Sequence, residues 1–152
     1  MRRLAALCPF ILLLASCGVS NTPVDLYYWG GSSNGTSVYE DLSYRTYKQQ
    51  TPEVVCKLVC AYENMVSHPG GARNVPPPGI CAEYAYLLLQ ENTAAYFAEN
   101  ATDAQRNIFD STDYPELFRG KAEQLFAKEM EYYPESQVFI IPLIKKFLNR
   151  QP

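Results

Sequence analysis

Prolines divide this sequence into short segments, and most of these segments carry apolar residues at helical spacing. Several of the 11 prolines stand where an apolar stripe begins or ends: residues 52, 69, 76–78, 115 and 134. Proline fixes φ and lacks a backbone N–H, so it is tolerated in the first turn of a helix but breaks a helix interior or a central strand. No segment alternates polar and apolar residues for long enough to form a strand. We therefore expect an all-α domain, a small bundle of about five helices.

The apolar spacing places these helices along the chain. They cover approximately residues 38–50, 52–68, 80–89, 115–133 and 136–148. Thr51-Pro52-Glu53 supplies a cap, a first-turn proline and an early acid for the second helix. Val75–Gly79 is a stiff connector before the third helix, because each proline also disfavours helix in the residue before it. Pro142 should kink the last helix or mark its true start.

The first 17 residues follow a different plan. Arg2 and Arg3 precede an apolar run, Leu4–Leu14, and the small pair Ala15-Ser16 stands directly before Cys17. This is the organisation of a cleaved signal peptide. As a helix the run would rise about 16 Å, whereas the hydrocarbon layer of a bilayer is about 30 Å thick. We therefore expect residues 1–16 to be an export signal and not a permanent membrane span.

Leu14-Ala15-Ser16-Cys17 resembles the lipobox of bacterial lipoproteins and stands directly after the apolar run, where that motif must lie. The resemblance implies that Cys17 is acylated on its sulfur, that the chain is cut before it, and that the new amine is acylated too. Several acyl chains would hold the protein on a membrane. In such lipoproteins an Asp after the Cys favours the inner membrane, so Gly18 implies the outer membrane of a Gram-negative cell. The alternative is an ordinary secretory signal that leaves Cys17 as a thiol.

Charge and composition limit the classes of molecule that this chain is suited to bind. Loss of residues 1–16 removes two arginines from a chain of 13 basic and 16 acidic residues, which leaves 136 residues with a net charge of −5. Such a chain lacks the broad basic face that nucleic acid requires, and as a whole it has no electrostatic reason to lie on an anionic leaflet. Residues 17–36 are rich in Gly, Ser, Asn and Thr, which predicts a lipidated flexible tether before a helical domain at 37–152.

The most aromatic stretch of the chain lies inside this tether and contains Tyr27, Tyr28 and Trp29. It has three interpretations. An aromatic plug would pin the N-terminal arm to the helical body, and this is the arrangement we expect. A platform for stacking sugars and a surface anchor are the alternatives.

Three cysteines remain after Cys17. Cys56 and Cys60 are four positions apart on the second predicted helix, and Cys81 begins the third. We expect three small hydrophobic residues in a helix interface, while a disulfide from Cys81 to one of the other two is the alternative in an oxidising periplasm. The single histidine, His68, lies at a helix end without the spacing of a metal site or a catalytic pair. We therefore predict no catalytic residue, metal or cofactor.

Acidic residues follow the fourth predicted helix and its exit. Glu123, Glu129, Glu131 and Glu135 alternate there with Lys121 and Lys128. Such a pattern is typical of a solvated helix face, and we expect that here in preference to a pair of catalytic carboxylates.

The third and fourth predicted helices resemble a tetratricopeptide-type helix pair. Ala122, Phe126 and Pro134 have the spacing of the small, aromatic and proline positions of that repeat. One departure is that Tyr84 and Ala122 are 38 positions apart, about 25 more than in the repeat. The extra residues lie between Asn92 and Arg119. Within them Thr102-Asp103-Ala104-Gln105 looks like a capping box and predicts a short helix.

With these helices, the lipobox and Tyr28-Trp29-Gly30, most of the chain resembles a family of small bacterial lipoproteins of unknown function. Its members tend to be encoded beside lipoproteins similar to the curli secretion channel. The resemblance implies a non-enzymatic outer-membrane lipoprotein that binds or assembles with another envelope protein, for which a curli-secretion-channel-like lipoprotein is a candidate. The alternative is a surface lipoprotein that binds or processes glycans. The candidate interaction residues are Tyr27, Tyr28, Trp29, Tyr84, Leu88 and Phe126.

Overall fold

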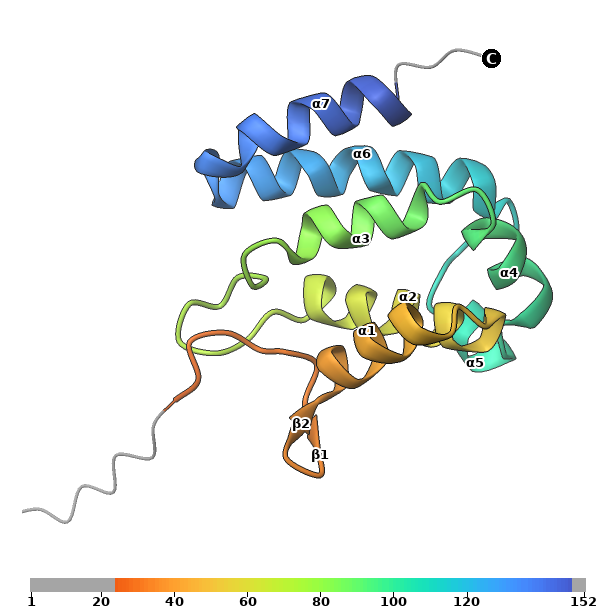
Figure 1. Ribbon diagram of the computed structural model, residues 1–152, viewed down its shortest axis with the longest axis horizontal. Coiled ribbons are helices and arrows are strands. Elements are labelled where there is room, and N and C mark those ends of the chain that lie inside the picture. Colours follow the sequence, from red (N-terminus) through yellow and green to blue (C-terminus); the bar gives the residue numbers. More distant parts are fainter. Residues whose placement is uncertain (1–23, 149–152) are drawn as a thin grey trace, which may run out of the picture.

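A computed structural model describes residues 24–148, and Figure 1 shows its arrangement. The elements in chain order are β1 (Ser32–Ser33), β2 (Thr36–Ser37), α1 (Val38–Lys48), α2 (Pro52–Ser67), α3 (Ile80–Leu88), α4 (Thr93–Asn100), α5 (Asp103–Arg106), α6 (Tyr114–Tyr132), the 3₁₀-helix η1 (Pro134–Ser136) and α7 (Gln137–Phe147). The all-α prediction is confirmed. The described residues form seven α-helices instead of about five, because the insert contributes both α4 and α5.

The helices lie in a stack. Helix α3 packs between α6 and α2, α1 covers the other side of α2, and α7 covers α6 (Figure 1). Helices α3 and α6 run in opposite directions and form the most extensive contact of the fold. Tyr84 of α3 and Ala122 and Phe126 of α6 are all fully buried. The two helices predicted to form a pair, α3 and α6, therefore pack against each other. Their likeness to a tetratricopeptide repeat stays a prediction.

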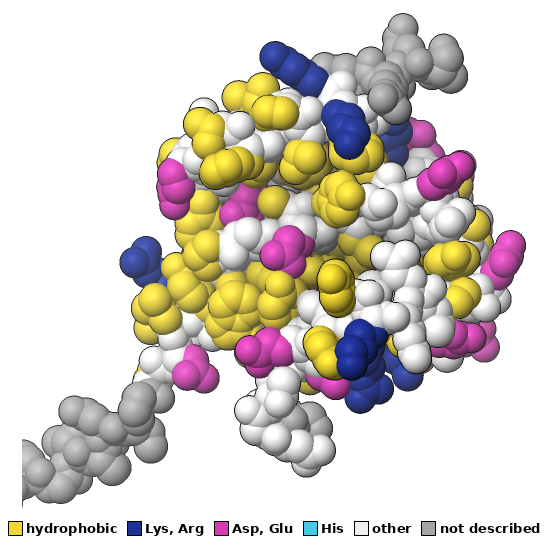
Figure 2. Space-filling view, viewed as in Figure 1, with side chains coloured by type: hydrophobic (Ala, Val, Ile, Leu, Met, Phe, Trp, Pro, Cys, Tyr) yellow, Lys and Arg dark blue, Asp and Glu magenta, His cyan; other side chains and the backbone are white. Residues whose placement is uncertain are grey.

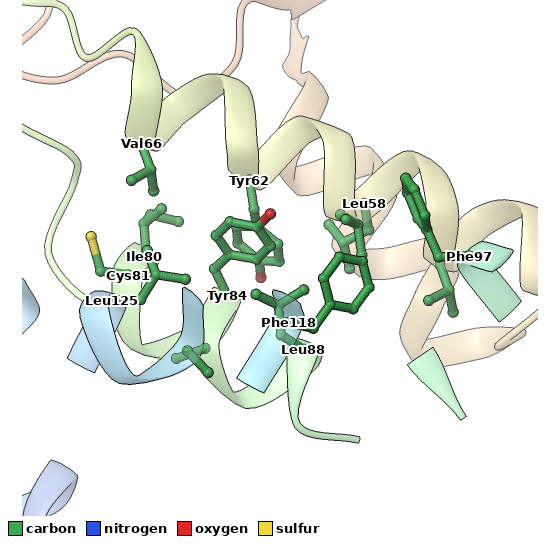
Figure 3. Packing of buried hydrophobic residues seen from close by; sticks show 14 of the residues in the cluster. Leu58, Tyr62, Val66, Ile80, Cys81, Tyr84, Leu88, Phe97, Phe118 and Leu125 are labelled. Atoms are coloured by element: carbon green, nitrogen blue, oxygen red, sulfur yellow. The ribbon is translucent and has the colours of Figure 1, made fainter. Parts of the chain in front are cut away.

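The core fills the space between α2, α3 and α6. Figure 3 shows side chains of α2 such as Leu58, Tyr62 and Val66 pointing toward α3. The rings of Tyr62 and Tyr84 stack with centroids 5.4 Å apart. Burial of such side chains contributes roughly 1.5–3 kcal/mol each and fixes which helix faces meet. Two turn signals set the ends of α2, since the Thr51 side chain accepts from the Val54 N–H and α2 stops at His68 before Pro69 and Gly70.

The insert is part of this core. Phe97 of α4 has no exposed surface. Its ring lies 5.2 Å from Phe109, 5.0 Å from Tyr114 and 5.5 Å from Phe118, measured between centroids. The capping box predicted at Thr102 is present, with the Gln105 N–H donating to Thr102 Oγ1 and the Thr102 N–H donating to Gln105 Oε1. The extra residues thus close one end of the helix stack.

The described part of the predicted tether, residues 24–36, also packs on the helices. The N–H groups of Ala72 and Arg73 donate to the carbonyls of Asp25 and Leu26 at 2.9 and 3.1 Å. Residues 32–37 form a two-stranded antiparallel hairpin. Asn34 and Gly35 at its tip have φ of 55° and 81°, and positive φ at both positions is what a type I′ hairpin turn requires. The folded body therefore begins before residue 37, in agreement with the plug interpretation.

Gly71 makes this docking possible, because a Cβ there would lie 2.7 Å from the carbonyl oxygens of Asp25 and Leu26. Its φ of +76° also disfavours any other residue. We expect Gly71→Ala to lower the free energy of unfolding by about 1–3 kcal/mol and to detach the arm. The single tryptophan, Trp29, reports this directly through its fluorescence.

Gly120→Ala is the matched control, since Gly120 lies within α6 and a Cβ there meets nothing within 4 Å. This variant should gain about 0.5–1 kcal/mol from helix propensity and keep the fluorescence of Trp29. Unchanged Trp29 emission in Gly71→Ala would contradict the docked arm.

Candidate functional site

A groove of about 670 Å³ lies between the hairpin, α1, α2 and α5, on the side of the stack away from α7. Apolar side chains of α1 and α2 line part of it, among them Val38, Leu42 and Ala61. Polar and charged side chains line the remainder: Asn34, Thr36, Ser37, Asp41, Arg45, Lys57, Asn64 and Gln105. Gly30 and Cys60 complete the lining. A partly apolar hollow with convergent polar groups is typical of a binding site.

The groove has an excess of positive charge. Arg45 and Asp41 form an ion pair on α1, with Arg45 Nη2 to Asp41 Oδ2 at 2.9 Å and Arg45 Nε donating to Asp41 Oδ1 at 3.0 Å. Both side chains are about half exposed, so the pair contributes little to stability but fixes the guanidinium. Lys57 on α2 has no carboxylate within 4.0 Å among the described residues. Two cations therefore face the groove with one carboxylate, in a chain whose net charge is −3.

Three amide side chains accompany these charges. Asn34 lies at the hairpin tip, Asn64 on α2 and Gln105 on α5. Asn64 Nδ2 donates to the Tyr28 hydroxyl at 3.2 Å, which connects the groove to the docked arm. An amide both donates and accepts hydrogen bonds, so these side chains complement a peptide backbone or a sugar hydroxyl.

The candidate interaction residues divide into two groups. Tyr28 is half-buried, whereas Trp29 is 37% exposed and lies over Tyr39 with ring centroids 5.5 Å apart. Tyr84, Leu88 and Phe126 are 0%, 4% and 0% exposed. The expectation that these three contact a partner is therefore wrong for this fold, because the packing of α3 on α6 and α2 covers them. Tyr27 is half-buried as well.

The three described cysteines are free thiols, so the alternative disulfide is not formed. Cys56 and Cys81 are 1% and 0% exposed and pack in the core as the preferred interpretation expects. Cys60 lines the groove. Burial, with Cys56 and Glu63 nearby, raises the pKa of Cys60 to about 12. A thiol with so high a pKa is a poor nucleophile near neutral pH.

Glu63 is a buried carboxylate that the sequence pattern did not single out. Its two oxygens accept from Ser67 Oγ at 2.7 Å, Tyr84 Oη at 2.8 Å and Lys121 Nζ at 2.9 Å. Burial favours the neutral acid, but the contacts with Lys121, Ser67 and Tyr84 outweigh it and lower the pKa of Glu63. The carboxylate therefore connects α2, α3 and α6 and is engaged in the fold.

Glu129 corrects the prediction of a solvated acidic face on α6. It is 1% exposed, and its oxygens accept from the Gly79 N–H at 2.7 Å and the Cys81 N–H at 3.2 Å. The first N–H groups of a helix have no acceptor within the helix, and α3 has no side-chain cap of its own, so Glu129 supplies the missing acceptor. Burial is the largest effect on Glu129 and raises its pKa. The signal was available, since Glu129 follows Ala122, Leu125 and Phe126 at helical spacing on the buried face.

Among residues 24–148, no group of three or more His, Cys, Asp or Glu side chains is placed to hold a metal ion. No helix in the same range is both long and apolar enough to cross a membrane. No protein-family model matches the sequence, and comparisons with curated proteins and with solved structures find no match.

Proposed function

We propose that this chain is a non-enzymatic lipoprotein of a Gram-negative outer membrane that acts as an interaction or assembly module. In this proposal Cys17 carries the acyl anchor, and the groove beside the docked arm binds an acidic, extended segment of another envelope protein. The position of the lipobox after the apolar run supports the anchor. Cys17 itself lies outside the described residues.

The charge of the groove carries the proposal for the ligand. Arg45 and Lys57 lie on two different helices and face one cavity, and the three amides are set around them. A ligand carboxylate would gain charge-assisted hydrogen bonds from the two cations, while the amides would pair with peptide N–H and C=O groups. A curli-secretion-channel-like lipoprotein stays the candidate protein to supply such a segment, on the family resemblance alone.

The roles of the buried polar groups support a non-enzymatic module. Glu63 and Glu129 are engaged in holding helices together. The groove thiol, Cys60, has a raised pKa. The two buried carboxylates thus have contacts that explain their positions through folding.

Glycan binding is the second candidate, and the partial exposure of Trp29 beside the amide-lined groove favours it. The three-ring platform is not presented in full, because Tyr27 and Tyr28 are half-buried. A neutral oligosaccharide would use the amides and Trp29 and would not depend on the two cations.

A fluorescein-labelled peptide of alternating Asp and Ser residues tests the proposal in a fluorescence anisotropy titration of the full chain. We expect saturable binding that weakens with salt, and at least tenfold weaker binding by the double variant Arg45→Gln, Lys57→Gln. A tenfold loss of affinity corresponds to about 1.4 kcal/mol of binding free energy. Loss of the charge-assisted hydrogen bonds from the two cations is enough to account for it.

Lys48→Gln is the matched control, because Lys48 is an exposed cation of α1 outside the groove lining. It removes one positive charge as Lys57→Gln does, and binding should stay within twofold of the original. Equal binding of an analogue with Asn in place of Asp, or an equal loss in Lys48→Gln, would refute an acid-specific groove. Binding of a neutral oligosaccharide alone would favour the glycan candidate.

A further inference from the structure

Helix α7 is apolar on almost every side but is covered on only one. Its sequence is QVFIIPLIKKF, and Ile140 is its single buried residue. On the inner side, the Phe147 ring meets the Tyr86 ring at 5.6 Å. On the outer side, Val138, Phe139 and Ile141 are 70%, 74% and 44% exposed. A helix with apolar residues all round is ordinarily covered all round, so the outer face of α7 needs a second surface.

Charges are arranged in order along this outer face. Val138, Pro142 and Lys145 follow one another at steps of four and three positions, which places them on one side of α7. Two exposed acids precede this helix, Glu131 in the last turn of α6 and Glu135 in η1. The last turn of α7 contains Lys145 and Lys146, and α7 has no acid of its own. Along the upper edge of Figure 2, where α7 lies, acidic side chains are at the left end, hydrophobic side chains come next and basic side chains follow toward the right, with further acidic side chains beside them at the right end.

This order is complementary to itself when reversed. If the outer faces of two α7 helices meet in opposite directions, the acids before one helix lie against the lysines at the end of the other, and the apolar middles meet. A parallel pairing would instead place like charges together. We propose that the outer face of α7 binds a second copy of this chain in an antiparallel, two-fold symmetric dimer, in which every contact occurs twice.

The size of the face predicts a weak dimer. Eleven residues of helix extend about 16 Å, so the pairing buries less than the roughly 1,200 Å² of a standard stable interface. Confinement on a membrane raises the effective concentration of the partner copy, and a weak contact then suffices. The groove lies on the other side of the stack, so the dimer would present two grooves at once. The pairing uses a different surface from the groove, so loss of peptide binding would leave it unchanged, but its sufficiency at low affinity rests on the proposed membrane anchor.

Crosslinking within cells tests the pairing on the full chain. A photo-reactive residue replaces Val138, and two copies carry different epitope tags. We expect a crosslink between the two tags. The variant Lys145→Glu, Lys146→Glu and the variant Glu131→Lys, Glu135→Lys should each reduce its yield at least tenfold when expressed alone. Coexpression of the two variants restores opposite charges across the interface and should restore the crosslink.

The same photo-reactive residue at Tyr47 is the control, because Tyr47 is 90% exposed on α1, on the far side of the stack. It should give no crosslink between tags. Recovery by coexpression also excludes misfolding as the reason for the single losses. Adducts of residue 138 with lipid or with a different protein in place of the second tag would overturn the dimer, as would a crosslink yield that charge reversal does not change.

Discussion

Replacement of Phe97 with alanine should lower the free energy of unfolding by about 4 kcal/mol. Phe97 is fully buried, and its ring meets the rings of Phe109, Tyr114 and Phe118 at centroid distances of 5.0 to 5.5 Å. Alanine would remove the apolar area of the ring and leave a cavity between α4 and the start of α6. Because a domain is stable by about 5–15 kcal/mol in total, this single change should remove between about a quarter and most of the stability of the fold.

Urea titration at a low protein concentration measures this effect, and Phe139→Ala is the matched control. The same substitution is made there on a side chain that is 74% exposed, so the monomer should change by no more than about 0.5 kcal/mol. Equal effects of the two variants would show that the insert does not contribute to the core. The comparison therefore separates burial from the mere loss of an aromatic residue.

The long helices could be predicted because their signals are local. Thr51 and Pro52 mark the start of α2, and the apolar stripe that follows has one period throughout. Helix α4 was missed, since Thr93–Asn100 is stabilised by Phe97 packing on distant aromatic rings and not by a cap of its own. The hairpin was missed for a different reason. The glycine-rich composition around it suggested a flexible connector, although Asn34-Gly35 is a strong turn signal.

The groove could not be predicted from the sequence. Its lining comes from four elements, and residues such as Asn34 and Gln105 are 71 positions apart along the chain. Arg45 and Lys57 each fit a solvated helix face when considered alone, and only the packing of α1 on α2 brings them to one cavity. The burial of the two acids was missed for a related reason. A charged residue on a helix is ordinarily exposed, and only the tertiary fold decides which partner it meets.

Loss of the Glu63 carboxylate should be the second large effect. Glu63→Ala leaves Lys121 Nζ and the Tyr84 hydroxyl without the acceptor that they contact at 2.8 Å. The Glu63 side chain is 12% exposed and that of Lys121 26%. Breaking a buried pair costs about 3–5 kcal/mol, and because solvent reaches the lysine we expect about 3 kcal/mol. Asp41→Ala is the control, since its ion pair with Arg45 is about half exposed and should contribute less than about 1 kcal/mol.

The pH dependence of stability distinguishes Glu63 from the other buried acid. The pKa of Glu63 is lowered in the folded protein, so its contribution is complete above the ordinary value of 4.5 and is lost as the pH falls through the lower folded pKa. The stability difference between the original chain and Glu63→Gln should therefore shrink in acid. Burial raises the pKa of Glu129, so folding favours the protonated form of this acid. As the pH falls through the raised pKa, the original chain should therefore gain stability relative to Glu129→Gln. Urea titrations at pH 7, 5 and 3.5 measure both. Trends of the same sign would mean that one of the two carboxylates is not held as its contacts indicate.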